Sequence, residues 1–159
     1  MEESLIYMNR AEYAKELFIN GHACSQAVAL AFVDILDISK EQLTKITLPF
    51  GGGLGRLRLT CGAMSGIAAV VGLVFAEDNL NKDNKIEVYK IIQELAKEFE
   101  EMNGSVVCKE LLERSMNSVE IGGMPEDRTS EYYKKRSCSE IVYNAALILE
   151  NYLIKRGII

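Results

Sequence analysis

The chain contains four cysteines, and each lies where the sequence pattern predicts the start of a helix. Cys24 and Cys108 follow short turns that contain Asn-Gly, Cys61 follows a glycine-rich loop, and Cys138 opens the last long apolar segment. The N-terminus of a helix presents unpaired N–H groups and a partial positive charge, and both stabilise a thiolate. Four cysteines in this setting predict thiolates that are gathered for redox or metal chemistry.

The spacing of the four cysteines does not by itself define a metal site. No two are separated by the two residues typical of zinc knuckles, and they do not form the clustered run of ferredoxins. Buried cysteine also serves as a small hydrophobic residue in helical cores. Because a helical bundle brings several helix ends to one side, we expect the four cysteines to meet at one site. Four thiolate charges there need a metal ion, a cluster, protonation or disulfide formation to offset them.

A second feature is the glycine-rich loop before Cys61, which reads FGGGLGR at residues 50–56. Glycine permits positive φ and a close approach of the backbone to a ligand, and successive N–H groups can form an anion nest. The loop matches neither the dinucleotide fingerprint nor the P-loop, and no strand precedes it. We therefore expect the loop to line the cysteine site, with a plain flexible connection as the alternative. The residues expected to contact a cofactor are Gly52, Gly53, Gly55 and Arg56.

Cationic residues lie close to two of the cysteines in sequence. Arg56 and Arg58 precede Cys61, and the run Lys134-Lys135-Arg136 precedes Cys138, although charged runs are usually solvated faces. We expect the pKa of the Cys61 thiol to fall below its ordinary value of about 8.5, because a helix start, a loop of N–H donors and two arginines act together. The single histidine, His22, is either an extra ligand or base for Cys24 or a solvated turn residue.

Helical periodicity dominates the sequence, and no segment shows the alternation of a strand. The segment from Cys61 to Phe75 is apolar nearly all round and includes small residues such as Gly66, which is typical of a central helix surrounded by others. Residues 116–129 read as a loop. The sequence predicts an all-α fold, a compact single-domain bundle of about five long helices plus short ones over residues 1–159. The expected helices span residues 7–18, 24–35, 39–48, 61–75, 85–102, 108–112 and 138–153.

Composition narrows the classes of function. The 159 residues are 48% hydrophobic, enough for one domain with a full core. The net charge of −5, with both signs interspersed, argues against a nucleic-acid partner. The most apolar stretch, residues 62–76, is shorter than the ~20 residues that cross a bilayer, so we expect no membrane insertion. No signal peptide is visible after Met1. We expect a cytoplasmic protein with reduced thiols, and homo-oligomerisation is left open.

Taken together, these residues resemble the family of redox-active proteins named for its C_GCAxxG_C_C cysteine pattern. The resemblance rests on the FGGGLGR loop and the motif from Cys61 to Gly66, CGAMSG, with Cys24 before them and Cys108 and Cys138 after them. It covers roughly residues 21–153. One departure is the link at residues 57–60, Leu-Arg-Leu-Thr, which is more apolar and basic than the short polar link of the family.

The resemblance implies a small helical protein with a redox role, of a kind common in anaerobes and sometimes encoded near transporters. The cysteine module is also similar to part of certain multihaem electron-transfer proteins, in which an iron–sulfur cluster is the suspected occupant. This chain has no CxxCH haem attachment site. We therefore expect an iron–sulfur cluster, held by the four cysteines, that serves electron transfer or redox sensing with an unidentified redox partner protein. The alternatives are metal-free thiol–disulfide chemistry and a structural zinc site in an interaction protein.

Overall fold

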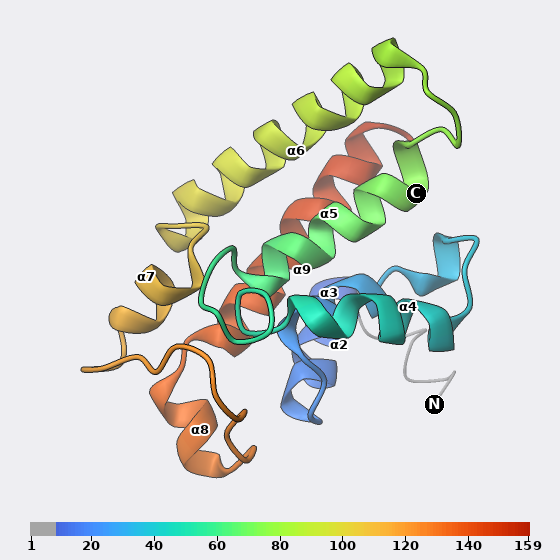
Figure 1. Ribbon diagram of the computed structural model, residues 1–159. Coiled ribbons are helices and arrows are strands. Elements are labelled where there is room, and N and C mark those ends of the chain that lie inside the picture. Colours follow the sequence, from blue (N-terminus) through green and yellow to red (C-terminus); the bar gives the residue numbers. More distant parts are fainter. Residues whose placement is uncertain (1–8) are drawn as a thin grey trace.

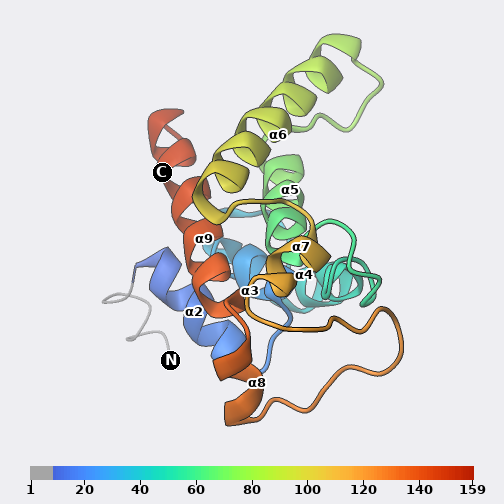
Figure 2. The same ribbon diagram turned by 90° about the vertical axis from the view of Figure 1, so that its left-hand side faces the viewer.

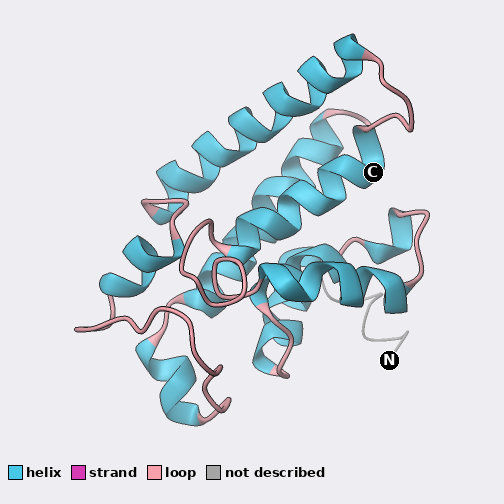
Figure 3. Cartoon of the chain, in the orientation of Figure 1, coloured by secondary structure: helices cyan, strands magenta, loops and turns pink. Residues whose placement is uncertain are grey.

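The computed structural model describes residues 9–159, and this part of the chain consists of helices and loops without a strand (Figure 3). The predicted all-α fold is confirmed, although Tyr7, which we assigned to the first helix, lies outside the described residues. The elements are α2 (Arg10–Ile19), α3 (Cys24–Leu30), η1 (Val33–Ile35), α4 (Lys40–Thr47), η2 (Leu48–Phe50), α5 (Gly62–Phe75), α6 (Lys82–Asn103), α7 (Cys108–Glu113), α8 (Ser130–Lys135) and α9 (Cys138–Lys155).

The course of the three longest helices brings distant parts of the chain to one end of the molecule. Helices α5 and α9 begin at the same end and run side by side, and α6 returns antiparallel to both (Figures 1 and 2). Helix α6 ends at Gly104, whose left-handed φ of 100° turns the chain, and α7 then begins close to the starts of α5 and α9. The starts of α5, α7 and α9 therefore share one end of the bundle.

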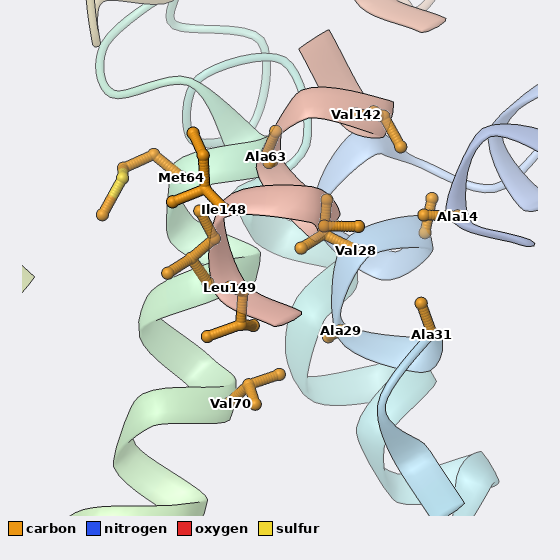
Figure 4. Packing of buried hydrophobic residues seen from close by; sticks show 14 of the residues in the cluster. Ala14, Val28, Ala29, Ala31, Ala63, Met64, Val70, Val142, Ile148 and Leu149 are labelled. Atoms are coloured by element: carbon orange, nitrogen blue, oxygen red, sulfur yellow. The ribbon is translucent and has the colours of Figure 1, made fainter. Parts of the chain in front are cut away.

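Helix α5 has the central position that its sequence predicts. It packs against α3, α4, α6 and α9, and it buries seven residues, among them Gly66. A Cβ atom at Gly66 would stand 2.7 Å from the Ser25 carbonyl oxygen, so only glycine permits this approach of α3. Small side chains such as Ala29 and Ala63 lie beside larger ones such as Val28 where these helices meet (Figure 4). Close packing of this kind fixes the helix starts relative to one another.

The second predicted helix is shorter than expected. The sequence pattern predicts a helix to Ile35, but α3 ends at Leu30 and a separate 3-10 turn, η1, follows it. Arg10 accounts for the break, because its guanidinium donates a 2.8 Å hydrogen bond to the freed carbonyl of Ala31 and stacks on the ring of Phe32. Four helices of the described part, α2, α5, α6 and α9, have ten or more residues, close to the predicted five.

Local signals at several helix ends agree with the structure. Ser39 accepts a hydrogen bond from the Gln42 N–H and caps α4, as its capping-box spacing predicts. Ser105 fixes the chain ahead of α7, although the N-cap itself is Val107. None of the helices in residues 9–159 combines the length and the apolar character that a membrane crossing requires.

Candidate functional site

Each of the four cysteines stands at the N-terminus of a helix. Cys24, Cys108 and Cys138 are the first residues of α3, α7 and α9, and Cys61 is the N-cap of α5. The sequence prediction of four helix starts is confirmed at all four positions. All four cysteines are free thiols in the structure.

The four cysteines line a single cavity of about 490 Å³. Backbone hydrogen bonds fix two of them, since the Cys61 N–H donates to Val106 and the Cys108 N–H donates to Leu59. Two glycines permit the close approach of Cys24 and Cys108. The Cys24 sulfur occupies the space that a side chain at Gly62 would take, and a Cβ atom at Gly53 would stand 2.7 Å from that of Cys108. The structure thus brings together four thiols from four different helices.

The glycine-rich loop is wound in the left-handed sense. Residues 52–56 all have positive φ, between 54° and 72°, and the loop appears as a tight coil beside the start of α5 (Figure 1). Gly52 and Gly55 contribute to the cavity lining, whereas Gly53 lies buried beneath Cys108. Leu54 and Arg56 also have left-handed backbone, which costs a residue other than glycine about 1–2 kcal/mol. The loop forms part of the cavity wall and is held by backbone hydrogen bonds such as those from Arg56 to Gly51 and from Arg58 to Gly52, and its contact with a cofactor stays a prediction.

This winding turns the arginines inward and the leucines outward. Arg56 and Arg58 are 8% and 7% exposed and line the cavity. Leu54, Leu57 and Leu59 are 44%, 48% and 52% exposed. The loop therefore supplies positive charge to the cavity, while its leucine side chains face solvent.

The arginines of the loop are held by the segment at residues 116–129. Arg56 donates a 2.7 Å hydrogen bond to the Gly122 carbonyl, and its own carbonyl accepts from the Gly122 N–H. Arg58 donates from Nε to the Glu120 carbonyl at 2.9 Å, and its Nη1 lies 3.9 Å from the Cys108 sulfur. The segment is a loop, as its sequence predicts, but it also closes one side of the cavity.

Three further charged residues line the cavity and complete its wall. They are Glu126, Arg128 and Arg136. In the sequence, Arg136 stands out only as part of a basic run, and the other two do not stand out at all. The Arg136 side chain is buried and pairs with Glu126 at 2.8 Å, whereas Lys134 and Lys135 are exposed. Arg128 stacks on the rings of Phe18 and of Tyr132 and Tyr133. The only sequence signal for these residues is that they precede Cys138 in a loop of mixed charge.

The pKa values of Cys61, Cys108 and Cys138 are raised, whereas the sequence predicts a lowered pKa for Cys61. Burial raises the pKa of Cys61 well above its ordinary value, and the nearby sulfurs of Cys24 and Cys138 raise it further. A hydrogen bond from the Ala63 N–H lowers this pKa, but its effect is smaller. Burial also raises the pKa of Cys108, although the Arg58 hydrogen bond lowers it in part. Burial together with Cys24 and Cys108 raises the pKa of Cys138 to about 12. The expectation of an acidic Cys61 is therefore wrong, because loss of water outweighs the helix N-terminus.

His22 does not join the four cysteines around the cavity. Its side chain is half-buried, with Nδ1 3.2 Å from the Leu17 carbonyl oxygen, and it is absent from the cavity lining. Within residues 9–159, no three cysteine, histidine, aspartate or glutamate side chains are arranged to hold one metal ion. The cysteines surround the cavity and do not converge on a single point.

The fold and the site together define the class of protein. It is a small all-α protein in which four helices begin at cysteines around one arginine-lined cavity. Comparison with family models identifies the family of the chain. The chain belongs to the family described as "Putative redox-active protein (C_GCAxxG_C_C)", whose model matches residues 22–152. The match includes all four cysteines and the glycine-rich loop. No curated protein and no solved structure matches the chain.

Proposed function

We propose that the four cysteines form one redox site that binds an iron–sulfur cluster and serves electron transfer or redox sensing. One observation carries the proposal: Cys24, Cys61, Cys108 and Cys138 come from four helices and line the same cavity. Four cysteine thiolates are the usual ligands of such clusters, and a bound cluster supplies reversible one-electron chemistry.

The arrangement of the cysteines around the cavity supports a cluster over a single zinc ion. A zinc ion needs four ligand atoms about 2.0–2.3 Å away, and the described residues contain no such converging group. The sulfur ligands of a cluster bind different iron ions, so they do not have to converge on one metal ion.

The burial of the thiols supports a cluster over metal-free thiol–disulfide chemistry. A thiol reacts as its thiolate, and burial keeps Cys61, Cys108 and Cys138 protonated near neutral pH. A metal cation removes this obstacle because it makes the thiolate the favoured form. We propose that the protein is cytoplasmic, since reducing compartments keep such cysteines free of disulfides. We also propose that it exchanges electrons with a redox partner protein.

The test is a series of single substitutions, in which each cysteine is changed to serine. We expect anaerobically purified wild-type protein to show the broad visible absorption of an iron–sulfur cluster, and each variant to lose most of it. Gly72→Ala is the control, because Gly72 lies on α5 in open space away from the cysteines. Full absorption in all four serine variants would mean that the cysteines are not the ligands.

A further inference from the structure

The wall of the cavity carries more positive than negative charge. Four arginines line it, namely Arg56, Arg58, Arg128 and Arg136, together with one carboxylate, Glu126. A partly enclosed cavity lined by one sign of charge concentrates ions of the opposite sign. Only the guanidinium groups that lack a counterion within the protein favour a bound anion.

Two of the four arginines are compensated. Arg136 and Arg56 share Glu126, at 2.8 Å and 3.5 Å, and Glu120 lies 3.4 Å from Arg56. Two carboxylates therefore face two guanidinium groups, and this part of the wall is close to neutral.

Arg58 and Arg128 have no carboxylate partner among residues 9–159. Arg58 is 7% exposed and donates to the Glu120 carbonyl, with the Cys108 sulfur as its other polar contact. Arg128 donates to the carbonyls of Phe18 and His22 and contacts the Tyr133 hydroxyl. Carbonyl and hydroxyl groups hold a guanidinium in place but do not neutralise it. Withdrawing a charge from water without a counterion is costly, and this applies most to Arg58, since Arg128 is only half-buried. The two positive charges together favour an anionic occupant.

The backbone of the loop shows that the inward arginines are specifically held. Arg56 and Arg58 have φ of 68° and 61°, in the left-handed region that residues other than glycine rarely adopt. A right-handed path would relieve the backbone strain at both residues. The chain instead keeps these arginines inside and leaves Leu57 and Leu59 exposed.

We infer that the cavity binds a small dianionic molecule whose oxyanion groups contact Arg58 and Arg128. Two uncompensated guanidinium groups match two negative charges, and guanidinium binds carboxylate, phosphate and sulfate oxygens with paired hydrogen bonds. The cavity volume of about 490 Å³ lies within the range of small-molecule sites. This inference goes beyond the proposed cluster, because it gives the chemical class of a ligand bound beside the redox site.

The test is isothermal titration calorimetry of the anaerobically purified protein, with whatever metal it carries, at low ionic strength. The probes are inorganic phosphate, sulfate and succinate, with uncharged succinamide as the matched control for succinate. We expect saturable binding of at least one dianion, at about one per chain, and no binding of succinamide. Tighter binding of phosphate or sulfate would identify an inorganic oxyanion as the source, and tighter binding of succinate would identify a dicarboxylate.

Substitutions then locate the bound anion. Arg58→Gln and Arg128→Gln should each weaken binding by about tenfold or more, because each removes a charge-assisted hydrogen bond. Arg58→Lys keeps the charge, so it should bind more tightly than Arg58→Gln and serves if the glutamine variant fails to fold. Arg10→Gln is the control, since it removes the same charge from a residue that pairs with Asp34 outside this cavity.

Three results would overturn the inference. They are the absence of saturable binding by any dianion, an affinity that is unchanged in Arg58→Gln and Arg128→Gln, and an equal loss in Arg10→Gln. Each of these results comes from the titration, whereas the cluster proposal is tested by the iron and sulfide content measured on the same sample. Failure of the anion site is therefore distinguishable from failure of the cluster proposal.

Discussion

Cys138 lies at the start of α9, and the charges of Cys24, Cys108 and two arginines affect the pKa of its thiol. Burial and the neighbouring sulfurs raise its pKa, and Arg136 and Arg128 oppose them. The same balance holds at Cys61, where burial again has the largest effect. At the scale of single residues, burial therefore favours the protonated thiol at Cys61, Cys108 and Cys138, because it raises the pKa of each.

This balance predicts that metal-free, reduced protein loses stability as the pH rises above about 8.5, the value for an unfolded cysteine. The pKa of Cys138 is about 12 in the folded state. The native thiol therefore keeps its proton while the unfolded chain loses it, and the free energy of unfolding falls between these two pH values. The contribution of Cys138 is at most about 1.4 kcal/mol per pH unit.

Urea unfolding of the wild type and of Cys138→Ala, from neutral pH to pH ~10, gives the free energy of unfolding as a function of pH. The difference between the slopes of these two curves measures the contribution of Cys138. We expect a shallower fall for Cys138→Ala, and a wild-type slope for Ser139→Ala, which changes a non-titrating neighbour on α9. Identical slopes in wild type and Cys138→Ala would show that the pKa of Cys138 is not raised in the folded protein.

Helix α5 is the element on which the geometry of the site most depends. It carries Cys61 at its N-cap and packs on α3, which carries Cys24, through the close approach at Gly66. Gly72 lies two turns further along the same helix, where a Cβ atom would meet nothing within 4 Å. The two glycines therefore offer a matched comparison of packing within one helix.

We expect Gly66→Leu to destabilise the fold by roughly 1–3 kcal/mol or more, because the side chain would press on the backbone of α3. Gly66→Ala should destabilise in the same direction, since its Cβ atom would stand 2.7 Å from the Ser25 carbonyl oxygen. Gly72→Ala should stabilise by up to about 1 kcal/mol through helix propensity. Thermal or urea unfolding checks the three variants, and equal midpoints for Gly66→Ala and Gly72→Ala would mean that α5 does not pack on α3 in this way.

At the scale of the whole molecule, the order of helices explains how cysteines far apart in sequence form one site. Helices α5 and α9 start at the end of the bundle to which α6 returns, and α7 begins there (Figures 1 and 2). Helix α3 starts at the same cavity and packs against α5. A bundle with this topology delivers four helix N-termini to one place without any short sequence motif that joins them.

Much of this arrangement is predictable from the sequence, because it depends on local signals. Periodicity predicts the helices, the turns before Cys24 and Cys108 predict their starts, and the small residues around Gly66 predict the central helix. The acidity of Cys61 is not predictable in this way, since it depends on how fully the cavity excludes water. The inward course of Arg58 depends on a left-handed backbone and on contacts with Glu120, which is distant in sequence.

The role of residues 116–129 in the cavity wall is also not predictable from the sequence, for a related reason. Their composition is that of a solvated loop, and Glu126 itself is substantially exposed. Their contribution to the cavity arises from hydrogen bonds and ion pairs to Arg56, Arg58 and Arg136, and no local pattern in the sequence records these contacts.

The proposal that Cys24, Cys61, Cys108 and Cys138 hold an iron–sulfur cluster is tested most directly by chemical analysis of anaerobically purified protein. The measurement is the iron, acid-labile sulfide and zinc content per chain. We predict iron and inorganic sulfide in nearly equal amounts, with little zinc, and loss of both in the variant with all four cysteines changed to serine. Wild-type protein that contains zinc alone, or that contains no metal after anaerobic purification and iron–sulfur reconstitution, would contradict the proposal.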